Sequence, residues 1–156
     1  MKKEGTENGK LYFGQVPHFE DTDNGFNLVQ SCAILRHLGR KCNAYGANEQ
    51  DMCKVDIAID GVSDWRRLYS KLVYTDKMAP EAVTEYKSNS IPLWTQNFER
   101  YIGSNQFVAG SSCTIADYAL FDLVDTQLRT IPDLLDNTPQ LKAWYGRMSE
   151  RSGIKA

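Results

Sequence analysis

One stretch, residues 29–40 (VQSCAILRHLGR), constrains the fold most, because it has the pattern of a strand that runs directly into a helix. Over 26–30, Phe26, Leu28 and Gln30 alternate with Asn27 and Val29, as in a short strand. Ser31 then suits the N-cap position, and apolar residues recur at helical spacing until Gly39. The first turn of such a helix offers backbone N–H groups and the positive end of the helix dipole, so the junction is a candidate carboxylate site. A Ser-capped turn with no ligand is the alternative, because such caps are common.

The size and charge of the chain limit its fold and its partners. With 156 residues, 42% of them hydrophobic, it can bury the core of one domain, or of one domain and part of another. A net charge of −2 lacks the basic excess of nucleic-acid or anionic-membrane binders, so we expect small molecules or proteins as partners, no nucleic acid and no membrane. The first nine residues lack the apolar core of a signal peptide, which predicts a cytoplasmic protein.

The cysteine and histidine content predicts no metal centre. The four cysteines form no C-x-x-C pair, and two histidines are too few for an obvious zinc site. We therefore expect reduced, mostly buried thiols. A reactive role for Cys42 or Cys53 would require an exposed and electropositive setting.

The order of patterns along the chain predicts an α+β protein that is mostly α. Residues 1–9 are polar and glycine-rich, as in a flexible end. A strand, turn, strand and helix follow over 10–41, with the turn at Asp21–Gly25. Turn-forming residues over 42–48 predict a linker, and 49–156 is expected to be all helical.

The helical part is predicted to contain four main helices. Apolar spacing indicates helices over 49–72, 91–102, 115–128 and from Pro139 onward, whereas 75–90 is expected to be a connection or a weak helical turn. The 115–128 helix is apolar almost all round, as a central buried helix would be. Thr114 and Asp117 have capping-box spacing, and replacing either should cost about 0.5–2 kcal/mol.

Several motifs, in this order, resemble those of the cytosolic glutathione S-transferases. They are G-Q-V-P-x-F-E-D over 14–21, L-V-Q-S-x-A-I-L-R-H-L-G-R-K over 28–41, D-G-V-x-D-x-R over 60–66 and T-I-A-D-Y over 114–118. The resemblance is nearest to the pi class, with the sigma class next, and extends from residue 11 to the end. It implies a partial thioredoxin-like domain, made of the hairpin and its helix, followed by an all-helical glutathione S-transferase C-terminal domain.

The resemblance also implies a glutathione site in the first domain. The backbone of Val16, before a cis-proline, would pair with the cysteinyl part of glutathione. Gln30 and Ser31 would hold the γ-glutamyl carboxylate at the helix start, and Gln15 would lie along the same groove.

Three further roles follow from the same resemblance. Asp64 would cross the dimer axis to the ligand amine of the other subunit, whereas Asp56 and Asp60 are expected to form a solvated acidic stripe. Tyr74 would face the electrophile pocket, with a half-buried aromatic at the helix end as the alternative. Phe13 occupies the place of an aromatic dimer key, which implies a homodimer.

The resemblance has one departure, at the beginning of the sequence. Transferases of this type open with a strand, helix and strand that carry a Tyr or Ser hydroxyl for the glutathione thiolate, and this sequence has no counterpart of that segment. The catalytic residue is therefore unknown, and Tyr12 cannot be assigned as a substitute.

The sequence leaves three functions open. The leading one is conjugation of glutathione to electrophilic small molecules, as in detoxification, by a complete or truncated transferase with glutathione as co-substrate and no other cofactor. The alternative is a non-catalytic, transferase-like module that dimerises or binds ligands. A plain helical bundle with accidental motif matches is the third.

Overall fold

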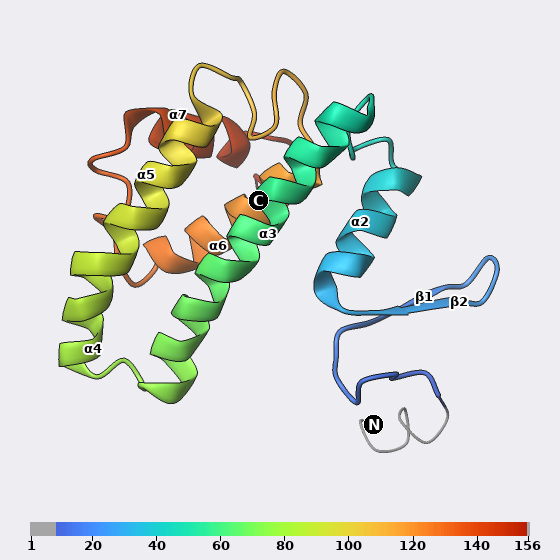
Figure 1. Cartoon of the computed structure of the whole chain (residues 1–156), viewed down its shortest axis with the longest axis horizontal. Helices are drawn as coiled ribbons and strands as arrows, with labels where there is room; N and C mark the ends of the chain where they lie inside the picture. Colours follow the sequence, from blue (N-terminus) through green and yellow to red (C-terminus); the bar gives the residue numbers. More distant parts are fainter. Residues whose placement is uncertain (1–8, 156) are drawn as a thin grey trace. The chain divides into compact units, whose positions relative to one another are not determined.

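The computed structural model describes residues 9–155 and is mostly helical, with one small sheet (Figure 1). Most of the predicted flexible end lies outside the described residues. The described chain divides into two compact units between Tyr45 and Gly46. The first unit contains β1 (His18–Asp21), β2 (Phe26–Val29) and α2 (Ser31–Lys41). The second contains α3 (Glu49–Ser70), η1 (Lys71–Thr75), α4 (Pro80–Glu85), η2 (Tyr86–Ser90), α5 (Ile91–Ile102), α6 (Ile115–Leu128) and α7 (Pro139–Ser149). The fold class is thus α+β and mostly α, as predicted.

The hairpin of the first unit is a two-stranded antiparallel sheet. His18 lies opposite Val29, and Asp21 lies opposite Phe26. At the turn, the N–H of Gly25 donates to the carbonyl of Asp21 over 2.7 Å. Gly25 has a φ of 71°, which a residue without a Cβ adopts at little cost.

Two groups of contacts hold α2 to the hairpin. The ring of His37 lies 5.7 Å from that of Phe19 and 5.5 Å from that of Phe26, measured between centroids. One turn further along, at the last residue of the helix, the ammonium of Lys41 donates to the carboxylate of Asp21 over 2.7 Å. This hydrogen bond lowers the pKa of Asp21 below its usual value. The C-terminal half of α2 is therefore tied to the sheet by side chains.

The helical unit is built around the packing of α3 on α6 and of α5 on α7. Trp65 of α3 stacks on the ring of Trp94 of α5, so that these helices also lie side by side (Figure 1). A buried polar chain links three elements: Trp65 Nε1 donates to the Tyr86 hydroxyl over 2.9 Å, which donates to Oε1 of Gln127 over 2.7 Å. Burial raises the pKa of Tyr86, so the phenol stays protonated and remains a donor.

The segment before α5 is more helical than predicted. Residues 75–90 were expected to be a connection or a weak turn, but α4 and η2 occupy most of this range, and only 76–79 lie outside the helices. The local pattern fails here because large apolar residues are few. The helical structure is supported instead by Tyr86, which is buried and bonded to α3 and α6.

Asp117 is a fully buried carboxylate that joins several parts of the helical unit. Its Oδ2 accepts from the backbone N–H of Thr114 over 2.8 Å and from the Thr114 hydroxyl over 3.1 Å, within a capping box at the start of α6. Its Oδ1 accepts from the N–H of Val108 over 2.8 Å and from Nε1 of Trp144 over 2.9 Å. One side chain therefore fixes a loop, the start of α6 and the inner face of α7.

The start of α7 is capped by a residue of another helix. Thr138 at the N-cap position makes no side-chain capping bond. Instead, the carboxylate of Glu99 on α5 accepts from the N–H of Gln140 over 3.0 Å and from the N–H of Leu141 over 2.8 Å. A carboxylate at this end of a helix satisfies open donors and complements the helix dipole.

Replacing Asp117 by Ala should destabilise the protein much more than loss of one cap would. Three buried N–H donors would lose their acceptor, at about 1–3 kcal/mol each, so we expect the free energy of unfolding to fall by about 3 kcal/mol or more. Thr114→Ala should lower it by about 0.5–2 kcal/mol. Urea denaturation followed by tryptophan fluorescence measures both. Asp122→Ala, an exposed aspartate of the same helix, is the control, and an equal loss for Asp117→Ala and Asp122→Ala would contradict the prediction.

Candidate functional site

The predicted carboxylate site lies where β2 ends and α2 begins. The structure places Gln30 at the N-cap position and Ser31 as the first helical residue, so the prediction of Ser31 as the N-cap is wrong by one position. The first helical hydrogen bond runs from the N–H of Ile34 to the carbonyl of Gln30, over 3.0 Å. The backbone N–H groups of residues 31–33 come before this bond, so no carbonyl of the helix accepts from them. No acidic residue lies in this turn, which suits it to an anion.

The backbone of Gln30 has an uncommon conformation. Its φ is 73° and its ψ is 114°, so a residue with a Cβ occupies a region that favours glycine. Such a conformation costs about 1–3 kcal/mol and is found most often at functional sites. The side chains of Gln30 and Ser31 are both exposed, so a ligand can reach them.

The register of the hairpin brings Gln15 and Val16 to the same end as this junction. Because His18 pairs with Val29, the residues before β1 and those after β2 both lie at the end away from the turn. The peptide bond between Val16 and Pro17 is cis, as the resemblance implied. Gln15 and Val16 are exposed. Four of the predicted site residues therefore gather at one accessible end of the first unit.

The other two predicted site residues belong to the helical unit. Asp64 is exposed on α3, and its carboxylate lies 3.4 Å from the guanidinium of Arg67. Tyr74 lies in η1 with 81% of its surface exposed, which excludes the alternative of a half-buried aromatic. The partnership of Arg67 with Asp64 was missed from the sequence, although opposite charges three residues apart on a helix are a recognised signal.

An apolar pocket between α3 and α5 was also missed. It encloses about 140 Å³ and is lined by Ile57, Ala58, Gly61, Trp94, Asn97, Phe98 and Tyr101. The indole N–H of Trp94 is buried and has no hydrogen-bond partner among the described residues. Gly61 inside an amphipathic helix was the available signal, since a glycine there often marks a close approach.

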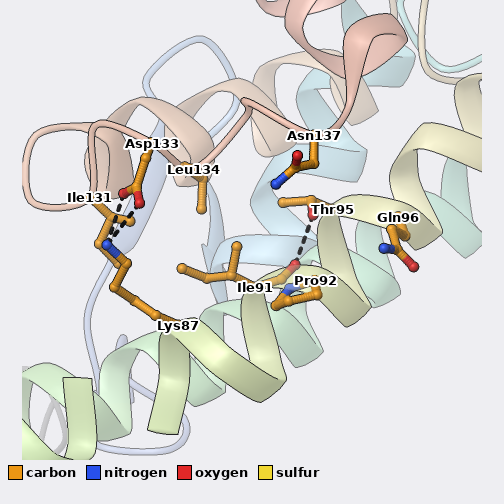
Figure 2. A pocket seen from close by; sticks show the side chains of 9 residues that line it. All are labelled: Lys87, Ile91, Pro92, Thr95, Gln96, Ile131, Asp133, Leu134 and Asn137. Atoms are coloured by element: carbon orange, nitrogen blue, oxygen red, sulfur yellow. Dashed lines mark hydrogen bonds and ion pairs between the residues drawn. The ribbon is translucent and has the colours of Figure 1, made fainter. Parts of the chain in front are cut away.

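A second pocket of the helical unit is lined by none of the predicted site residues (Figure 2). It is bounded at one end by the ion pair of Lys87 with Asp133, at 2.9 Å, and floored by buried side chains that include Ile91 and Leu134. Its volume is about 200 Å³. Ligand pockets usually enclose about 300–1,000 Å³, so this depression is small for an electrophile site.

The cysteines form no disulfide within the described part of the chain, and no cluster of potential metal ligands occurs there. Cys42 and Cys53 are exposed and Cys32 and Cys113 are half-buried, so the expectation of mostly buried thiols is wrong. Burial raises the pKa of the Cys113 thiol, which keeps it protonated and unreactive. Nor is any helix within residues 9–155 long and apolar enough to cross a lipid bilayer.

Comparison with known proteins gives consistent matches over the chain. A family model described as "Glutathione S-transferase, C-terminal domain" matches residues 63–156. Glutathione S-transferase P of Homo sapiens is 37% identical over 158 residues, which cover 99% of this chain and 73% of that protein. The chain belongs to the glutathione S-transferase family. The Bos taurus glutathione S-transferase P is 36% identical over 157 residues, covering 98% of this chain and 72% of the relative.

A solved structure agrees with the assignment of the chain to the glutathione S-transferase family. The pi-class glutathione S-transferase of Onchocerca volvulus superposes with a TM-score of 0.84 at 31% identity. The match covers 98% of this chain and 74% of that one. The predicted resemblance to the pi class is thereby confirmed.

Replacing Gln30 by Gly should stabilise the first unit of the transferase. Glycine adopts a positive φ without strain, so we expect the free energy of local unfolding of this unit to rise by about 0.5–1 kcal/mol. Hydrogen exchange of the β1 and β2 amides measures it. Gln30→Ala keeps the Cβ and should give no gain, and slower exchange in both variants would contradict strain at this position.

Proposed function

We propose that this glutathione S-transferase binds glutathione at the start of α2 and conjugates its thiolate to electrophilic small molecules. The observation that carries the proposal is the junction of Gln30 and Ser31, where a strained backbone and exposed polar side chains surround the N-terminal turn of a helix. Family membership supplies the substrate class. Glutathione acts as a co-substrate, and the proposal requires no other cofactor.

Each part of glutathione has a complementary group in this proposal. The γ-glutamyl carboxylate lies at the first turn of α2, where it accepts from backbone amides, the Ser31 hydroxyl and the Gln30 amide. The cysteinyl part pairs with the backbone of Val16 as an added strand would. Gln15 lines the same groove, and Asp64 of a second subunit binds the ligand ammonium.

The chemistry is nucleophilic attack by sulfur. A thiol with a pKa near 8.5 is only a few per cent ionised at neutral pH, so the site must favour the thiolate. The thiolate forms a bond to an electrophilic carbon, and a leaving group departs with its electron pair. Tyr74, which is exposed at the end of the α3 segment, is proposed to assist the electrophile. Holding both reactants in place supplies most of the remaining acceleration.

A homodimer is the second part of the proposal. The side chain of Phe13 is 68% exposed, and the apolar pocket between α3 and α5 has room for an aromatic ring edge. Exposed aromatics of this kind mark interfaces between proteins. We infer that Phe13 of one subunit inserts into the pocket of its partner, which also brings Asp64 to the partner's ligand.

A non-catalytic module that binds ligands or dimerises is the second candidate. The exposed Phe13, the α3–α5 pocket and the start of α2, where we propose the carboxylate binds, all lie within residues 9–155. No side chain in this range has been assigned to the glutathione thiolate. Such a module would bind glutathione and dimerise without turnover.

Calorimetric titration with glutathione, beside a rate assay with a generic aromatic electrophile, tests the proposed function. We expect binding, and we expect Gln30→Ala and Ser31→Ala each to weaken it about tenfold, because each removes a polar contact to a carboxylate. Loss of both binding and turnover in these variants supports the proposed enzymatic function.

Ser88→Ala is the matched control, because this exposed serine bonds only the Thr84 carbonyl of its own helical segment among the described residues. Binding without turnover in the wild type would favour the non-catalytic module. Equal affinity of wild type, Gln30→Ala and Ser31→Ala would contradict the placement of the carboxylate.

Phe13→Ser should dissociate the dimer, because it removes the inserted ring. Gly61→Leu should act from the other side, since it fills the pocket beside Phe98 and Trp94 without leaving the helix. Sedimentation velocity should show a shift toward monomer of at least about tenfold in the dimer dissociation constant for each variant.

Tyr12→Ser, which removes a neighbouring aromatic with 67% exposure, is the control and should leave the dimer unchanged. A wild-type protein that sediments as a monomer would remove the dimer proposal. Equal effects of Phe13→Ser and Tyr12→Ser would remove the specific role of Phe13.

A further inference from the structure

Asp64 and Arg67 form a pair of opposite charges on the surface of α3. Their closest side-chain atoms are 3.4 Å apart, and the side chains are 60% and 78% exposed. A surface pair of this kind adds little to stability, at most about 1 kcal/mol. The pair therefore presents two charges to solvent without being needed to hold the fold.

The next residue shows a contrasting arrangement. Arg66 reaches from α3 to α6, where its guanidinium donates to Asp122 over 2.8 Å and to the carbonyl of Ala119 over 3.4 Å. Arg66 thus links two helices, whereas the hydrogen bond described for Arg67 goes to a residue one turn earlier on its own helix. Arg67 has four further N–H donors in a planar fork that matches a carboxylate.

The charges of this pair are complementary to those of an α-amino acid end group. The γ-glutamyl residue of glutathione carries an ammonium and a carboxylate on one carbon atom. A carboxylate and a guanidinium held about 3 Å apart can bind both groups. The protein carboxylate then pairs with the ligand ammonium, and the guanidinium pairs with the ligand carboxylate. This exchange leaves no charge unpaired.

We propose that Arg67 is a specificity-determining residue of the glutathione site, which contacts the γ-glutamyl carboxylate while Asp64 binds the adjacent ammonium. The inference rests on the proposed function and on the assignment of Asp64 to the ligand of the second subunit. The carboxylate then has two anchors, the start of α2 in one subunit and Arg67 of the other. Thiols that lack the zwitterionic end lose both contacts and are discriminated against.

Three ligands, titrated calorimetrically against the full protein, separate the two contacts. They are glutathione, an analogue in which a glutaryl group removes the ammonium, and an analogue in which a 4-aminobutyryl group removes the α-carboxylate. Arg67→Ala should weaken glutathione and the glutaryl analogue about three- to tenfold and leave the aminobutyryl analogue unchanged. Asp64→Asn should weaken glutathione and the aminobutyryl analogue by a similar factor and leave the glutaryl analogue unchanged.

Two further variants control for net charge and for side-chain geometry. Arg66→Ala removes the same charge from the neighbouring residue and should leave all three affinities unchanged. Arg67→Lys keeps the charge but loses the fork, so its affinity for glutathione should fall between those of the wild type and Arg67→Ala. Sedimentation of each variant shows whether the dimer is intact. If Arg67→Ala dissociates the dimer, the affinities of Arg67→Lys for the three ligands decide whether Arg67 contacts the carboxylate.

Several outcomes would overturn the inference. Unchanged or tighter binding of glutathione by Arg67→Ala would mean that Arg67 only competes with the ligand ammonium for Asp64. Equal weakening of all three ligands would mean a structural role. If the wild type binds no glutathione, the proposed function fails as well. If the wild type binds glutathione and Arg67→Ala binds it with the same affinity, only this inference fails.

Discussion

The buried carboxylate of Asp117 is the interaction on which the helical unit depends. A carboxyl group without solvent is tolerated only when hydrogen bonds replace its hydration, and four donors surround this one. They come from a loop, from the start of α6 and from α7. Since α3 packs on α6, the carboxylate also supports the helix whose outer face carries Asp64 and Arg67. The surface ion pair is thus positioned by a carboxyl group in the core.

The first unit is supported in a different way. It has two short strands and one helix, a combination that is marginal by itself in water, and most of the apolar side chains of α2 are only half-buried. Its cohesion comes from the pairing of Lys41 with Asp21 and from the rings around His37. The proposed ligand would bind where this unit carries the strain of Gln30. Occupancy would therefore stabilise the unit through mass action.

Local chemistry in the sequence accounted for much of the fold. Periodicity located α3, α5 and α6, because this signal acts within one or two helical turns. The helical structure around Tyr86 was missed, since it depends on partners 21 and 41 residues away. At the site, residue types identified the junction, but neither the φ of Gln30 nor the pocket beside Gly61 follows from local pattern.

The cap that Glu99 provides to α7 links two helices that are far apart in the sequence. The first turn of α7 has no side-chain cap of its own at Thr138, so its amides are satisfied only after α5 is in place. An excised peptide containing α7 alone would therefore fray at its start. In the intact chain, α5 and the last helix should gain and lose structure together, as one cooperative unit of folding.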